Sequence, residues 1–328
     1  MKKTIFGFLT IVVVLSMIVG TCAAKAKKPI VLKAISFFPR EDVPSLAAWR
    51  IFKDLVNEKA KGELIIQYAG GPEVIGSLEQ PEAVRTGAMD IVTTSTSYSA
   101  PLCPAGLTNS VTRLNAIQLR ENGYYDLIDQ AFQKDMNARF FGWGERVPYN
   151  MFSSKPFYSP RELAGQRFRS ISTYEPFYKK LGIRGVSMSM EELYTAAERG
   201  TVVGTTMSHS MMLIYKWYEV IKYQIGPNIL VTECVMLMNL DKWNKLPKRL
   251  QDLMTKCQIE SERRTLPYWE ESVAKCKAAL KEKGMEVIEW SPADTRYFVD
   301  EIVYPAVWEW IEGKVGKELT AKLKAKAG

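Results

Sequence analysis

The chain has 328 residues, of which 47% are hydrophobic and 24% are charged, so it is long enough for about two domains of roughly 150 residues each. This composition excludes a mainly disordered, collagen-like or coiled-coil protein. The net charge is +8, from 44 Lys and Arg against 36 Asp and Glu that are interspersed, and we expect no nucleic-acid partner. A single histidine, His209, excludes a histidine-rich metal site.

Residues 1–24 are typical of a secretory signal peptide. Lysines precede an almost unbroken apolar run from Ile5 to Val19, and small residues follow it, as in the three regions of such a peptide. The run is shorter than the roughly 20 residues that span a bilayer. We therefore expect cleavage, and a mature periplasmic chain that does not span the membrane. Lipid attachment at Cys22 is the alternative, although Thr21 fits a lipobox poorly.

The remaining cysteines do not indicate a disulfide-rich fold. They are too few for a disulfide scaffold in a chain of this length, and none forms a CxxC pair of the zinc or redox type. A bridge between Cys257 and Cys276 and a set of buried free thiols are both open. The cysteines concerned are Cys103, Cys234, Cys257 and Cys276.

Strands and helices alternate in the first part of the mature chain. Apolar residues recur with periods of 2 and 3.6, and glycines end the segments. We predict strands at 30–36, 63–68 and 90–94 and helices at 44–60 and 78–85. This order favours a parallel α/β sheet.

A second α/β pattern follows without a flexible linker. We predict strands at 137–143, 166–170, 187–189, from 202, within 229–239 and at 285–290, and helices at 175–181, 190–199, 250–283 and from 294. Pro267 should kink or break the long helical segment. Two α/β units without a linker suggest a chain that crosses between domains more than once and encloses a cleft, where small ligands bind.

The common motifs of enzymes are absent. The sequence has no GxSxG, Walker, GxGxxG or HExxH segment. His209 stands between Ser208 and Ser210, but neighbouring side chains of a strand point to opposite faces. We interpret His209 as a surface or cleft-rim residue, and we predict no catalytic residues, no metal and no cofactor.

Five ordered segments carry a family resemblance. Residues 159–169 (SPRELAGQRFR) resemble the "P-x-D/E-L-x-G-x-K-I-R" segment of the solute-binding proteins of TRAP (tripartite ATP-independent periplasmic) transporters. Residues 192–204 (ELYTAAERGTVVG) resemble that family's "E-L-Y-T-A-L-x-x-G-x-V-D-G", and residues 82–90 (EAVRTGAMD) its "E-A-L-x-x-G-x-x-D". Residues 216–223 and 239–247 are similar to further family segments. The likeness covers nearly the whole mature chain.

The resemblance implies the two-domain α/β architecture of periplasmic binding proteins, with a ligand cleft between the domains and chain crossovers. We assign 25–145 plus 231–275 to domain I, and 146–230 plus 276–328, with crossing C-terminal helices, to domain II. The implied function is an exported receptor that binds an organic acid and delivers it to TRAP-type membrane permease subunits. The alternative is a periplasmic ligand sensor for a membrane signalling protein.

Two arginines are candidate ligand anchors. In the family, the Arg that ends "K-I-R" pairs with a ligand carboxylate, and Arg169 matches it. A planar guanidinium offers two parallel N–H bonds to a carboxylate and stays charged. Arg146 falls near a second family position that often carries a ligand-binding Arg. The competing interpretations are a surface residue for Arg169 and an ion pair with Glu145 or a neighbouring acid for Arg146.

Residues 202–208 depart from the family's "V-D-G-x-E-N-P", because Val203 replaces the usual Asp and Met207 stands where Asn or an aromatic is common. A thioether cannot donate to a carboxylate as an amide does, but it packs well against an apolar or aromatic body. We therefore expect a monocarboxylate with an apolar, 2-oxo or aromatic part. An ordinary core position for Met207 is the alternative.

Three further candidates follow predicted strands. Phe38 follows the first strand, and Thr96 and Tyr98 follow the third. Ligands of open α/β sheets bind at the carboxyl ends of strands. Tyr98 could offer its hydroxyl and Phe38 an apolar wall, unless these rings only fill the core of their own domain.

Overall fold

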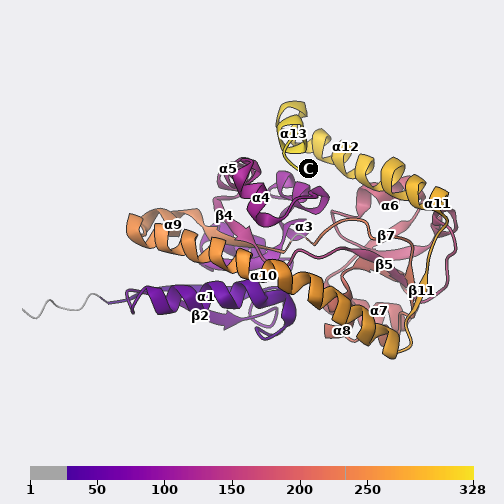
Figure 1. Cartoon of the computed structure of the whole chain (residues 1–328), viewed down its shortest axis with the longest axis horizontal. Helices are drawn as coiled ribbons and strands as arrows, with labels where there is room; N and C mark the ends of the chain where they lie inside the picture. Colours follow the sequence, from indigo (N-terminus) through magenta and orange to yellow (C-terminus); the bar gives the residue numbers. More distant parts are fainter. Residues whose placement is uncertain (1–27, 233) are drawn as a thin grey trace, which may run out of the picture.

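The computed structural model describes residues 28–232 and 234–328 (Figure 1). The expected signal peptide and Cys22 lie outside the described residues. Within the described ranges, no helix is both long and apolar enough to cross a bilayer.

The first sheet has five strands in the order β2-β1-β3-β10-β4. Their bounds are β1 Ile30–Ser36, β2 Leu64–Gly70, β3 Ile91–Ser95, β4 Ala138–Trp143 and β10 Cys234–Asn239. Strand β1 is parallel to β2 and β3, but β10 is antiparallel to both β3 and β4. The expectation of a parallel sheet is therefore confirmed for β1, β2 and β3, the strands for which it was made, whereas the direction of β10 was not predicted. This strand enters from the second half of the chain, so no helical crossover on this sheet sets its direction.

The second sheet has six strands in the order β11-β9-β5-β8-β6-β7. Their bounds are β5 Asn150–Ser153, β6 Arg167–Ser170, β7 Arg184–Ser187, β8 Gly204–Met207, β9 Tyr223–Ile225 and β11 Glu286–Ile288. Strand β6 is parallel to β7 and β8. Because parallel strands end at the same edge of a sheet, Arg169 near the end of β6 and Met207 at the end of β8 share one edge.

Helices cover both sheets, and we call the sheets with their helices the first and second domains. In the first domain they are α1 Ala47–Lys59, α2 Gln80–Thr86, α3 Thr96–Ser99, α4 Ala116–Glu121, α5 Tyr124–Met136, α9 Leu240–Lys245 and the 3-10 helices Pro44–Leu46 and Pro104–Val111. In the second domain they are α6 Glu175–Leu181, α7 Met190–Glu198 and α8 His209–Ile214. Helices α4 and α5 were not predicted from the sequence.

The longest helix, α10 (Lys248–Glu282), spans both domains. Its 35 residues extend for about 52 Å at 1.5 Å per residue, and it packs against α1 of the first domain and α8 of the second (Figure 1). The helix is continuous through Pro267, so the expected break does not occur. Packing along both domains outweighs the one backbone hydrogen bond that a proline removes.

Helix α10 also excludes the disulfide between Cys257 and Cys276. Cys257 and Cys276 both lie on it, 19 residues and therefore roughly 28 Å apart along its axis, far beyond the reach of a disulfide. Among the described residues, no disulfide joins any two of Cys103, Cys234, Cys257 and Cys276.

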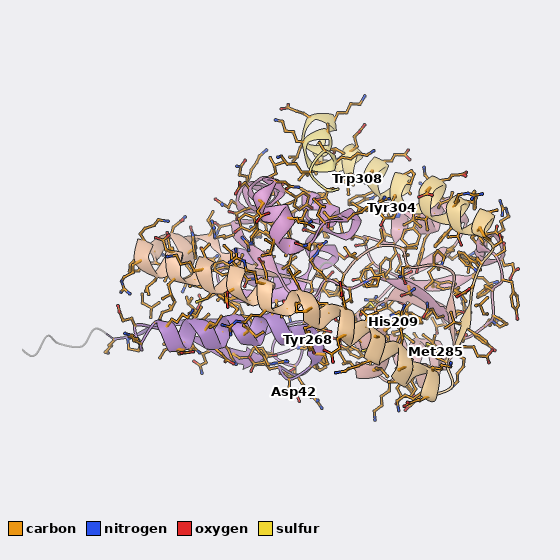
Figure 2. The ribbon with its side chains drawn as sticks, in the orientation of Figure 1. Asp42, His209, Tyr268, Met285, Tyr304 and Trp308 are labelled. Carbon is orange, nitrogen blue, oxygen red and sulfur yellow. The ribbon has the colours of Figure 1, made fainter. Side chains whose placement is uncertain are left out.

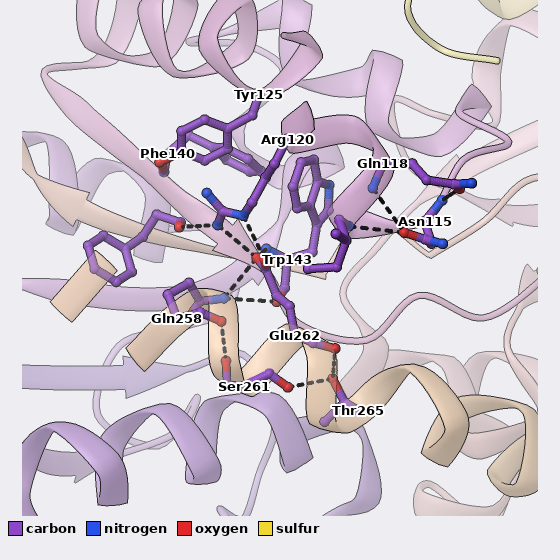
Figure 3. A network of polar contacts seen from close by, with 12 residues as sticks. Asn115, Gln118, Arg120, Tyr125, Phe140, Trp143, Gln258, Ser261, Glu262 and Thr265 are labelled. Atoms are coloured by element: carbon purple, nitrogen blue, oxygen red, sulfur yellow. Dashed lines mark hydrogen bonds and ion pairs between the residues drawn. The ribbon is translucent and has the colours of Figure 1, made fainter. Parts of the chain in front are cut away.

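A buried polar network fixes α10 to the first domain (Figure 3). Arg120 Nε lies 2.6 Å from Glu262 Oε2, and Glu262 Oε1 accepts from Arg120 Nη2 and from the backbone N–H of Trp143. Gln258 donates to the carbonyl oxygen of Trp143 and to Glu262 Oε1. The ion pair is therefore well supplied with hydrogen bonds, which a buried charge requires.

The C-terminal helices return across the molecule (Figure 1). They are α11 Pro292–Arg296, the π-helix Tyr297–Val303, α12 Tyr304–Val315 and α13 Lys317–Lys324. Helix α12 contacts α6 and the 3-10 helix Pro104–Val111, hence both domains. The backbone N–H of Arg113 donates to the carbonyl of Ala327 at 2.8 Å. The boundaries assigned to domains I and II stay a prediction.

Candidate functional site

A small cavity lies where the two domains meet. Its volume is about 20 Å³, and its walls come from both sheets and from the segments that connect β4 to β5 and β9 to β10. The residues that line it are Phe37, Phe38, Ser95, Glu145, Tyr149, Met190, Met207, Ser208, Met211, Thr232 and Cys234. A space of this size holds about one water molecule, so the domains are closed tightly around it.

Arg169 lies fully buried beside this cavity, with 0% of its surface exposed. Its Nε donates to the carbonyl of Met188 at 3.2 Å, and its Nη2 donates to the hydroxyl of Tyr98 at 3.3 Å. Its Nη1 is buried and, among the described residues, has no hydrogen-bond partner. These contacts are all to neutral groups. A guanidinium stays charged even when buried, and a buried charge is stable only when an opposite charge pairs with it.

Aromatic rings of the first domain form one wall. Phe38 is 1% exposed, and its ring centre lies 4.2 Å from that of Phe37. Phe37 in turn meets the ring of Tyr98 edge-on at 6.0 Å. Tyr98 lies on α3, directly after β3, so it presents its hydroxyl to the arginine of the opposite domain. Phe37 thus contacts both Phe38, which lines the cavity, and Tyr98, which does not.

Methionines of the second domain form the facing wall. Met207, at the end of β8, is 5% exposed and lines the cavity with Met190 and Met211. The hydroxyl of Tyr174 donates to the Met207 sulfur at 3.7 Å. A thioether accepts only weakly, so the surface presented here is largely apolar and polarisable.

Thr96 and Arg146 do not line this cavity. Thr96 is buried against the 3-10 helix that contains Gly106, where an added Cβ on Gly106 would lie 3.3 Å from the Thr96 Cβ. Arg146 donates to Thr112 Oγ1 at 2.7 Å and to the carbonyl of Leu114 at 3.0 Å. Burial lowers the pKa of Arg146 to about 10. A ligand-binding role for either residue stays a prediction.

Glu145 lines the cavity, and the sequence analysis considered it only as a partner of Arg146. It is 2% exposed, and its Oε1 accepts from Ser45 of the first domain at 2.8 Å and from Ser210 of the second at 3.0 Å. Burial raises the pKa of Glu145 to about 7, although the two serine hydrogen bonds oppose the shift. Its position directly after β4, where the chain crosses between domains, is the signal that could have found it.

Further contacts hold the domains closed across the cleft. Ser77 of the first domain donates to Glu191 Oε1 of α7 at 2.9 Å, and Ser97 of α3 hydrogen-bonds Thr173 of the second domain. Together with the Tyr98–Arg169 contact, they connect the facing domains at separate points. The cavity between them is therefore one that domain separation would open.

A groove of about 880 Å³ lies at the end of α10, and its lining includes His209 and Met285, which Figure 2 labels. His209 lines it but is 2% exposed, so its interpretation as a surface or cleft-rim residue is wrong. Its Nε2 lies 2.8 Å from Gln224 Oε1, whereas Ser210 bonds Glu145. Burial lowers the pKa of His209 to about 4, which keeps it neutral near pH 7. This groove lies within the second domain and α10, so it lacks the two facing walls of the smaller cavity.

The described residues also contain no group of three His, Cys, Asp or Glu side chains that could hold a metal ion.

Comparison with known proteins adds a family match. Residues 36–310 match the model of the DctP family, described as "Bacterial extracellular solute-binding protein, family 7". The C4-dicarboxylate-binding periplasmic protein DctP of Rhodobacter capsulatus is 23% identical over 308 residues, which cover 91% of each chain.

Solved structures share the fold. A TRAP periplasmic solute-binding protein from Desulfovibrio salexigens with bound orotic acid superposes with a TM-score of 0.81 at 19% identity, covering 90% of this chain and 98% of that one. One from Pseudomonas putida F1 with bound D-glucuronate gives a TM-score of 0.77 at 21% identity, covering 90% and 97%.

Proposed function

Because the chain belongs to family 7 of the bacterial extracellular solute-binding proteins, the DctP family, we propose that it is the receptor of a TRAP-type secondary transporter. In this role it binds an organic acid outside the cytoplasmic membrane and delivers it to the membrane permease subunits. The receptor itself changes no covalent bond. It binds the acid, its domains close around it, and the permease recognises the closed form.

The buried guanidinium of Arg169 is the observation that carries the proposal. Its Nη2 donates to Tyr98 and its Nη1 lacks a partner within the described ranges. A ligand carboxylate would supply a negative charge, which the contacts of Arg169 with described residues do not, and would accept from the guanidinium in the bidentate geometry that arginine favours. Burial makes this pairing stronger than it would be in water.

The walls of the cavity favour one class of acid. Met207, Phe38 and their neighbours present apolar and aromatic surface, which suits a monocarboxylate with an apolar, 2-oxo or aromatic part. The orotic acid and D-glucuronate of the solved relatives each carry one carboxylate. The C4-dicarboxylate in the name of the Rhodobacter capsulatus relative is the competing class for this chain.

Closure would couple binding to recognition. A cavity of about 20 Å³ is too small to admit an organic acid, so entry requires the domains to separate and the walls to rearrange. Tyr98 comes from the first domain and Arg169 from the second, so a ligand that binds both favours the closed state by its differential affinity.

A thermal-shift screen of the mature protein tests the proposal. The panel contains dicarboxylates, 2-oxo acids, sugar acids and aromatic acids. A ligand at 100 times its dissociation constant stabilises by about 2.7 kcal/mol, which corresponds to several degrees. A shift with a monocarboxylate supports the proposal, and a shift with C4-dicarboxylates alone contradicts the ligand class. If no acid raises the melting temperature, the protein is denatured and tested for the release of an acid that was already bound. The absence of a released acid contradicts the receptor function.

A further inference from the structure

A buried carboxylate, that of Glu145, lines the cavity beside which Arg169 lies buried. Arg169 contacts Tyr98, whose ring meets Phe37. Phe37 also lines the cavity, and Glu145 lines the same cavity. A ligand held by its carboxylate at Arg169 would extend along Phe37 and meet Glu145.

Resting on the proposed function, we propose that Glu145 selects the ligand of this receptor. It favours a monocarboxylate whose far end carries a hydroxyl or N–H donor, and it rejects an acid with a second carboxylate at that end.

The surroundings of Glu145 supply hydroxyls. Ser45 and Ser210 both donate to its Oε1, and the hydroxyls of Ser208 and Ser210 lie 2.9 Å apart. Ser208 itself lines the cavity. A ligand hydroxyl or N–H placed here can donate to the carboxylate and join a network that already consists of hydroxyl groups, so its desolvation is compensated.

A second ligand carboxylate has no such compensation. It would place two negative charges side by side in a buried site, and one of them would have to take up a proton before the domains could close. Burial already raises the pKa of Glu145 to about 7, which reflects how unfavourable one negative charge is there. The ligand carboxylate therefore belongs at the Arg169 end alone.

A purely structural role for Glu145 predicts something different. If its two serine hydrogen bonds only joined the domains, its replacement would weaken the binding of all ligands by a similar factor. Selection instead predicts a change in the ratio between ligands that differ only at their far ends. That ratio separates the two roles.

The test uses matched pairs of acids and calorimetric titration at pH 8. The pairs are D-gluconate with D-glucarate, 5-hydroxypentanoate with glutarate, and 4-hydroxybenzoate with terephthalate. In the first two pairs a hydroxymethyl group replaces one carboxylate, and in the third a hydroxyl group does. In the wild-type protein, every pair that binds should favour the hydroxy acid at least tenfold. Glu145→Gln, which keeps the shape but removes the charge, should bring the ratio to about one.

Two further variants make the outcomes distinct. Glu191→Gln removes an exposed carboxylate of α7 at the cleft contact with Ser77 and should leave the ratio unchanged. Arg169→Ala should weaken the binding of both members of a pair roughly 100-fold or more. Binding that needs Arg169 but shows no preference in the wild type, or the same preference in Glu145→Gln, overturns only the selection by Glu145. Wild-type affinity in Arg169→Ala, or no binding by any of the acids, contradicts the proposed function as well. Because the wild-type ratio alone can contradict the proposal, the test does not depend on the folding of a variant.

Discussion

The Nη2 atom of Arg169 lies 3.3 Å from the hydroxyl oxygen of Tyr98, across 71 residues of sequence. Arg169 belongs to β6 of the second sheet, and Tyr98 lies on α3 directly after β3 of the first. The contact therefore exists only when the two domains face each other closely. Arg169, the proposed ligand anchor, therefore takes part in a contact that forms when the domains close.

Tyr98→Phe should weaken ligand binding roughly tenfold or more, because a hydrogen bond to a charged group contributes about 1.5–3 kcal/mol. Calorimetric titration with the best ligand of the screen measures the change. Tyr158→Phe is the matched control, since Tyr158 is 66% exposed and should not affect binding. Equal affinities for the two variants would contradict a role for the Tyr98 hydroxyl in the closed state.

Glu262→Gln should lower the free energy of unfolding by about 3–5 kcal/mol, because it leaves the buried Arg120 without its negative partner. Urea unfolding followed by circular dichroism measures the loss. Glu260→Gln on the same helix removes an exposed pair with Arg264 and should change stability little. A similar effect of both variants would show that the network in Figure 3 does not fix α10.

Gly142→Ala should destabilise the protein by more than about 1 kcal/mol. Gly142 has a φ of +154°, and an added Cβ would collide with Glu262 and lie 2.7 Å from Arg120 Nη2. Gly313→Ala offers the contrast, because that glycine lies within α12 with nothing within 4 Å of an added Cβ. Alanine there should be neutral or slightly stabilising. In thermal unfolding, the melting temperature should therefore fall in Gly142→Ala and stay unchanged or rise slightly in Gly313→Ala.

Glu145→Gln should stabilise the ligand-free protein more at high pH than at low pH. Burial raises the folded-state pKa of Glu145 from 4.5 to about 7, so the folded protein holds this proton more tightly than the unfolded chain does. Stability is then greatest below pH 4.5 and is lost as pH rises through 7. The variant lacks this loss, and its gain over wild type should be about 2–3 kcal/mol larger at pH 8 than at pH 5. Urea unfolding at both values checks this, and an equal difference would contradict it.

Local patterns predicted much of the fold. The strands around Ile30–Ser36 and Leu64–Gly70 follow from alternating apolar residues, because one sheet face packs on a helix. The direction of β10 did not follow, since it depends on the path of the chain through the second domain. The continuity of α10 through Pro267 was also missed, because tertiary packing outweighed a local signal.

The candidate site, like the fold, was predicted only in part. Phe38 was predicted from its place after a strand and Met207 from its place in the family segment matched by residues 202–208, and both line the cavity. Arg169 lies buried beside it. The side chain of Arg146 donates to Thr112, and its ligand-binding role stays a prediction. Glu145 was missed because its two serine partners are 100 and 65 residues away, and no local pattern reports such contacts.

Calorimetric titration of the best organic acid into the wild type, Arg169→Ala and Arg167→Ala tests the central claim most directly. Arg167 lies on the same strand but is exposed and donates to the carbonyl of Gly200. Arg169→Ala should weaken binding roughly 100-fold or more, as expected for the loss of one member of a buried charge pair, whereas Arg167→Ala should bind like the wild type. Wild-type affinity in a folded Arg169→Ala protein would contradict the assignment of Arg169 as the carboxylate anchor.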